Sequence, residues 1–161
     1  MSKAELGDFE LPPIDQVAYV VKDLDRAIER FGTLFGPFSV IDAELVDTLY
    51  RGRSADAKLR VAFGRSGSLE IELIEVVSGE TPHREFLEAY GEGVHHIRCP
   101  VEDLDRALVD VNARGFETIW YQANEEQGIK FAYVQASPGQ GGAMIELIEG
   151  LPSGPTQWPP K

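Results

Sequence analysis

An internal repeat constrains the fold of this chain more than any other feature of its sequence. The segment 23–27 reads DLDRA and recurs 80 residues later at 103–107. The pentapeptide IELIE at 71–75 recurs 74 residues later at 145–149. Two matched segments in the same order, with spacings that differ by six residues, indicate two homologous modules that differ in one loop. The length of 161 residues suits a single globular domain that holds both modules.

Each module is predicted to follow the order βαβββ, which makes the fold class α+β. Runs rich in Val, Ile and Tyr at 14–21 and 94–101 are typical of strands. Apolar residues at helical spacing follow each run, and the repeated aspartates before them are predicted N-caps. Further strands are predicted at 44–50, 58–63, 69–76, 117–121, 130–135 and 143–148, with turns at 64–68 and 137–142.

The repeat also predicts the organisation of the chain. Residues 1–13 form an N-terminal arm, 14–90 the first module, 91–150 the second module and 151–161 a Pro-rich tail that contains Trp158. The first module ends in a linking helix from Thr81 to Tyr90, because Pro is favoured at the first helical position.

Composition excludes several classes of function. There are 27 acidic and 15 basic residues, for a net charge of -12, and no basic stripe, so nucleic acid and anionic membranes are not expected partners. Cys99 is the only cysteine, which excludes an intramolecular disulfide and indicates a reducing compartment. No apolar signal core or membrane-spanning run is present, so we expect a cytoplasmic protein.

Alternation along the predicted strands places four polar residues on one face of the sheet. Successive side chains point to opposite faces, so the first Ile and the Leu of each IELIE segment are expected to face the helices. Gln16, Glu72, His96 and Glu146 then face away from the helices, at matched positions of the repeat. If the two modules curl about a pseudo-two-fold axis, these four side chains meet in one cleft.

These four residues offer a reasonable set of ligands for a divalent metal. One imidazole with two carboxylates and an amide oxygen favours Mg, Mn, Co or Fe(II) over structural zinc or Cu(I). The alternative is structural: a hydrogen-bonded histidine in the core and solvated glutamates on an outer face.

Other polar and aromatic residues have open roles. His95 is predicted to face the helices with a structural role, and His83 to lie exposed on the linking helix. Arg98 shares the face of His96, where it either pairs with a glutamate of the set or binds a substrate carboxylate. Five aromatic residues either line an apolar pocket or pack in the core: Tyr50, Phe63, Trp120, Phe131 and Tyr133.

At these residues the sequence resembles the vicinal oxygen chelate superfamily, which includes glyoxalases, bleomycin resistance proteins and extradiol dioxygenases. The resemblance rests on IDQVAYVVKDLDRA, GVHHIRCPVEDLDRA and SPGQGGAMIEL, and it is nearest to the methylmalonyl-CoA epimerase-like branch. It implies a curved, cup-shaped mixed sheet around a shared metal cleft, and a homodimer. The implied ligands of a Mn, Co, Ni, Fe or Zn ion are Gln16, Glu72, His96 and Glu146. The epimerase-like pattern has histidine where this chain has Gln16.

The resemblance also implies a type of chemistry. Members use an open metal site to stabilise an enolate while a base removes a proton next to a carbonyl. The candidate bases are Glu72 and Glu146, or Asp56 before the third strand. Glu44 is a further candidate, for which a surface position is expected. The leading hypothesis is a metal-dependent isomerase or epimerase acting on an oxo acid or acyl thioester. The alternatives are a glyoxalase-type lyase and a resistance-type protein that binds a small molecule without catalysis.

Overall fold

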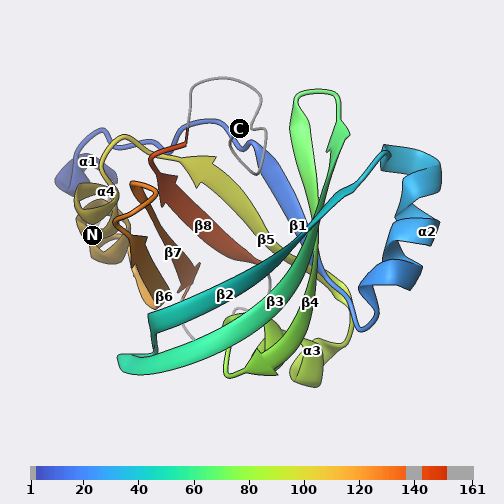
Figure 1. Ribbon diagram of the computed structural model, residues 1–161. Helices are drawn as coiled ribbons and strands as arrows, with labels where there is room; N and C mark the ends of the chain where they lie inside the picture. Colours follow the sequence, from blue (N-terminus) through green and yellow to red (C-terminus); the bar gives the residue numbers. More distant parts are fainter. Residues whose placement is uncertain (1–2, 137–142, 152–161) are drawn as a thin grey trace.

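Eight strands close into a barrel in the computed structural model, which describes residues 3–136 and 143–151 (Figure 1). The strands are β1 (Gln16–Val20), β2 (Ser39–Tyr50), β3 (Arg53–Ser66), β4 (Leu69–Gly79), β5 (Gly93–Pro100), β6 (Phe116–Asn124), β7 (Ile129–Ala136) and β8 (Met144–Glu149). The helices are α1 (Lys3–Leu6), α2 (Leu24–Phe35), α3 (Pro82–Tyr90) and α4 (Leu104–Ala113). The predicted turn at 137–142 and the predicted tail after Leu151, with Trp158, lie outside the described residues.

The strand order around the barrel reflects the internal repeat. The order is β1-β4-β3-β2-β6-β7-β8-β5, so strands 1–4 and strands 5–8 form two equivalent halves. The halves meet where β1 pairs antiparallel with β5 and where β2 pairs antiparallel with β6. Because β1 and β5 run parallel to β4 and β8, respectively, the sheet is mixed. The α+β prediction with a curved mixed sheet is confirmed, and the sheet closes on itself.

The repeated sequence motifs hold each strand–helix junction together. Asp23 and Asp103 cap α2 and α4 by accepting from the backbone amides of the residues three positions later, each at 3.0 Å. The last glutamates of the IELIE segments, Glu75 and Glu149, accept from the first helical amides at 2.6 and 2.8 Å. Carboxylates at helix N-termini satisfy free amides and oppose the helix dipole, which explains why these residues occur in both modules.

The hairpin of β3 and β4 is longer than the sequence pattern predicts. Strand β3 continues through Gly64 to Ser66, and the turn to β4 is centred on Gly67, which has a φ of 59°. A Cβ at Gly64 would lie 2.5 Å from the carbonyl oxygen of Phe35 and 2.7 Å from the Phe38 ring. Glycine at this position therefore lets the end of α2 pack against the strand, rather than forming a turn.

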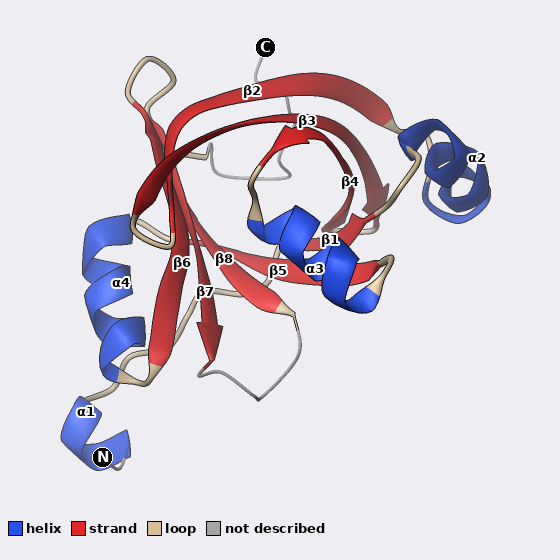
Figure 2. Ribbon diagram, turned by 90° about the horizontal axis from the view of Figure 1, so that it is seen from below, coloured by secondary structure: helices blue, strands red, loops and turns tan. Residues whose placement is uncertain are grey.

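Apolar side chains fill both faces of the barrel wall. The interior cluster includes Ala18, Ile74, Trp120 and Met144, whereas separate clusters lie beneath α2 and α4. Figure 2 shows α3 across one end of the barrel, between β4 and β5. The helix begins at Pro82 after the N-cap Thr81, as the sequence predicts.

Candidate functional site

Cross-strand pairing brings the polar residues of β4, β1 and β5 into two rows inside the barrel. In one row, Ala18 of β1 lies opposite Glu72 on one side and His96 on the other. In the adjacent row, Gln16 lies between Glu70 and Arg98. The small side chain of Ala18 leaves room for the imidazole and the carboxylate to approach each other across β1.

His96 lies at the centre of a cluster of oxygen atoms. Its Nε2 atom is 2.9 Å from Glu146 Oε2, 3.3 Å from Glu72 Oε2 and 3.2 Å from Gln16 Oε1. The His96 side chain is fully buried, whereas the carboxylates of Glu72 and Glu146 retain 13% and 9% exposure. All four residues predicted from the repeat therefore meet at one place.

The spacing of these atoms fits a shared divalent cation. Ligand atoms bound at about 2.1 Å and at right angles to one another lie about 3 Å apart, close to the distances around His96. The one hydrogen on His96 Nε2 can form a well-aligned hydrogen bond to only one of the three oxygens. A cation can bind all three oxygens and the nitrogen at once, so it fits this arrangement better than hydrogen bonds alone. The residues that could hold it are Gln16, Glu72, His96 and Glu146.

The carboxylates around His96 change its protonation. Burial alone lowers the pKa of His96, but hydrogen bonds and charges from Glu146 and Glu72 outweigh it and raise the pKa to about 9. In the metal-free protein, these ion pairs stabilise the fold fully below the unfolded pKa of about 6.5, and the contribution is lost as pH rises through 9.

Metal affinity should therefore rise with pH. A cation needs the neutral imidazole, so the affinity for Ni²⁺ should increase about tenfold per pH unit from pH 6.5 to 8.5, with release of about one proton. Isothermal titration calorimetry in buffers of different ionisation enthalpy measures both quantities. An affinity that does not change with pH would contradict the raised pKa of His96.

A buried network orients the Gln16 amide. Gln16 Nε2 donates to Glu70 Oε1 at 2.7 Å, which leaves the carbonyl oxygen pointing to His96. Arg98 lies 3.3 Å from Glu70 and donates to both oxygens of Asp15 at 2.8 and 3.1 Å. Burial raises the pKa of Glu70, whereas Arg98 and the Gln16 amide oppose that rise and favour the ionised acceptor. Glu70 thus orients Gln16 so that its amide oxygen, and not its nitrogen, faces the position of a cation.

Glu70 and Asp15 also belong to this site, although neither was predicted from the sequence. Period-two alternation places Glu70 on the same face as Glu72, so a signal for Glu70 was present. The pairing of Arg98 with Asp15 and Glu70 was not predicted from the sequence. Burial lowers the pKa of Arg98, whereas these pairs and the charge of Glu146 raise it.

Replacing Glu70 by glutamine should weaken metal binding without removing a ligand. A glutamine at 70 can donate to Gln16, so the Gln16 amide can turn its nitrogen toward the cluster. Loss of such outer partners costs about 10–100-fold in metal affinity. Calorimetric titration with Ni²⁺ measures the effect, with Glu80→Gln at an exposed position just after the same strand as the control. Equal affinity in parent and Glu70→Gln protein would show that Glu70 does not orient Gln16.

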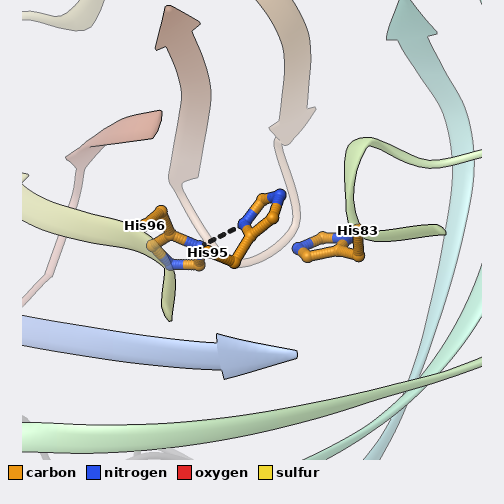
Figure 3. Close-up of side chains that lie close together, drawn as sticks. All are labelled: His83, His95 and His96. Atoms are coloured by element: carbon orange, nitrogen blue, oxygen red, sulfur yellow. Dashed lines mark hydrogen bonds between the residues drawn. The ribbon is translucent and has the colours of Figure 1, made fainter. Parts of the chain in front are cut away.

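A β-bulge in β5 lies next to His96, at His95. The register of β1 and β5 shifts so that Ala18 pairs with His96 and Tyr19 with Val94, which leaves His95 as the extra residue. His95 lies buried against His83 and Phe86 of α3. Its Nδ1 lies 3.0 Å from the Nδ1 of His96 (Figure 3).

The prediction that His83 is exposed is wrong. His83 is fully buried, because the first turn of α3 enters the end of the barrel. Its ring lies 4.5 Å from that of His95 (Figure 3). Its Nε2 lies 3.0 Å from the Tyr133 hydroxyl. Burial lowers the pKa of both His83 and His95 well below the usual value, so both rings are neutral near pH 7.

The structure does not bring Asp56 to this cluster. Asp56 is exposed in β3, where its carboxylate accepts from the backbone amide of Asp47 at 3.0 Å. Its neighbour Ala57 is buried, and alternation along β3 therefore turns Asp56 outward. This corrects the expectation that Asp56 is a base in the cleft.

The cluster borders an apolar pocket inside the barrel. The pocket has a volume of about 140 Å³ and includes Glu72 and Glu146 in its wall. Four of the five aromatic residues considered from the sequence, Phe63, Trp120, Phe131 and Tyr133, line it. Tyr50 does not line the pocket but packs in the interior core cluster, which also contains Trp120 and Tyr133.

Sequence comparison identifies the family. The profile of the glyoxalase/bleomycin resistance protein/dioxygenase superfamily matches residues 15–133. The chain belongs to this superfamily. The matched range contains Gln16, Glu72 and His96, whereas Glu146 lies beyond it. Members of the superfamily commonly use divalent metals, and the group Glu72, His96 and Glu146 is one that could bind such an ion.

Related proteins and structures agree with this assignment. The uncharacterized protein YqjC of Bacillus subtilis is 34% identical over 106 residues, which covers 63% of this chain and 72% of YqjC. Methylmalonyl-CoA epimerase from Mycobacterium tuberculosis has a TM-score of 0.62 at 22% identity, over 92% of this chain and 96% of that one. A variant of the Streptomyces coelicolor epimerase in complex with 2-nitronate-propionyl-CoA has a TM-score of 0.63 at 21% identity, over 92% and 100%. At these identities the structures support the fold.

Within residues 3–136 and 143–151, no helix is long and apolar enough to cross a membrane.

Proposed function

We propose that this protein is a metal-dependent isomerase or epimerase that moves a proton next to a substrate carbonyl through an enolate. The observation that carries the proposal is the convergence of Gln16, Glu72 and Glu146 oxygens on His96 Nε2 within 2.9–3.3 Å, beside an apolar pocket. When bound, a divalent metal would supply Lewis-acid polarisation of the carbonyl. The substrate classes that suit this chemistry are oxo acids and acyl thioesters.

The geometry supports different roles for the two glutamates. Glu146 is nearer to His96 than Glu72 is, at 2.9 against 3.3 Å, and it is less exposed. We therefore assign Glu146, His96 and Gln16 to metal binding and Glu72 to proton transfer. Glu72 takes the proton from the carbon next to the carbonyl and returns it to the enolate. The apolar walls of the pocket exclude water while the charge develops.

The homodimer and the cytoplasmic location belong to the same proposal. The family resemblance supports the homodimer, and the net charge of -12 with a single cysteine supports a reducing aqueous compartment. Light scattering on the purified protein tests the oligomeric state.

Solvent deuterium exchange tests the reaction type. Protein loaded with Mn²⁺, Co²⁺ or Ni²⁺ is incubated in D₂O with 2-oxo acids, acyl thioesters or hemithioacetals, and NMR follows the proton next to the carbonyl. We expect metal-dependent exchange that a chelator abolishes. Exchange with hemithioacetals alone would favour the glyoxalase-type alternative. Tight ligand binding without exchange across the panel would instead identify a binding protein.

A further inference from the structure

The charges around the pocket bear on which substrates the proposed site accepts. Among the described residues that line the pocket, Arg98 alone has a permanent positive charge. Its guanidinium already forms a bidentate pair with Asp15 and lies 3.3 Å from Glu70. The two carboxylates that border the pocket, Glu72 and Glu146, balance the two charges of a divalent cation. An anionic substrate group would therefore meet no net positive charge there.

The walls of the pocket favour an apolar group next to the reacting carbonyl. Six of the residues that form these walls are Ile41, Leu59, Val61, Phe63, Ile74 and Phe131. The volume is about 140 Å³, and a cavity of about 150 Å³ lined by Leu, Ile and Phe side chains admits benzene. The pocket thus has room for a group the size of a phenyl ring.

We infer that the reacting end of the substrate is uncharged and carries an apolar group of about this size next to the reacting carbonyl. This inference rests on the proposed function and narrows it to neutral ketones, hydroxy ketones and acyl thioesters, in preference to oxo acids. The net charge of -12 acts in the same direction, because it disfavours the approach of anions.

Three small ketones test separately whether the substrate is uncharged and whether it carries an apolar group. 2-Hydroxyacetophenone is neutral and has a phenyl group, benzoylformate has the same shape with a carboxylate, and hydroxyacetone lacks the ring. Binding to Co²⁺-loaded protein is measured by calorimetry and by the visible spectrum of the metal. The same titrations with cobalt nitrilotriacetate measure how strongly each probe binds cobalt without the protein. Each affinity for the protein is then divided by this reference affinity.

Relative to that reference, we expect 2-hydroxyacetophenone to bind the protein at least about tenfold more tightly than benzoylformate. Burial of the ring should make hydroxyacetone about 10–100-fold weaker. Val61→Phe, which places a larger side chain in the pocket wall, should remove the advantage of the ring in protein that still binds cobalt.

Two results would overturn the inference, and they are distinguishable. If the protein retains cobalt and binds benzoylformate as well as the reference complex predicts, the substrate class is wrong while the proposed function stands. If the folded protein binds no divalent metal, the proposed function fails and the inference fails with it.

Discussion

Replacing His96 by alanine should lower the affinity for Ni²⁺ or Co²⁺ by more than the roughly 10–100-fold that the loss of an outer hydrogen-bond partner costs. The reason is geometric, since three oxygen atoms surround one nitrogen, and removal of the imidazole leaves Glu72 and Glu146 without their common partner. Titration calorimetry and metal analysis of the dialysed protein measure the change.

Two further variants control for loss of the fold. Glu146→Gln keeps the size of the side chain and should lower affinity in the same direction. Glu44→Gln removes a carboxylate that pairs with Lys58 on the exposed surface and should leave affinity unchanged. The assignment of the metal centre is wrong if folded His96→Ala protein, checked by circular dichroism, binds these ions as tightly as the parent.

Replacing Glu72 by glutamine should lower the rate of solvent deuterium exchange by about 100–10,000-fold at saturating metal, the range that a positioned base contributes. The amide keeps an oxygen that can bind a cation, but it cannot accept the proton from carbon. The measurement is the initial exchange rate of the best substrate from the D₂O panel, followed by NMR at several metal concentrations.

Glu146→Gln is the matched control for this prediction. If Glu146 binds the metal and Glu72 transfers the proton, excess metal should restore exchange in Glu146→Gln and not in Glu72→Gln. The opposite pattern would exchange the two roles. Exchange in Glu72→Gln within about threefold of the parent rate would exclude Glu72 as the base, because such a loss lies below the contribution of a general base.

The candidate cluster was accessible from sequence for a local reason. Side chains of a strand alternate with period two, so the phase of one IELIE segment determines which residues face the helices. The repeat then transfers that phase to the second module, which relates Glu72 to Glu146 and Gln16 to His96. The helix caps Asp23 and Asp103 are local in the same sense, because each bonds an amide three residues away.

Other features depend on contacts between residues far apart in the chain. The bulge at His95 depends on pairing between β1 and β5, and no alternation pattern within β5 reveals it. The burial of His83 depends on how α3 enters the barrel, and the outward position of Asp56 depends on how far β3 extends.

Sequence alone determined the two-module architecture and the four residues that meet at His96, since periodicity and repetition are properties of neighbouring positions. The tertiary structure determined which partners surround those residues and what kind of pocket lies beside them. Cross-strand register placed Glu70 beside Gln16 and Arg98, and Asp15 accepts from Arg98, so the arginine is part of the buried network around Gln16. Closure of the barrel set the volume and the charge of the pocket, because both sum contributions from strands that only the fold brings together.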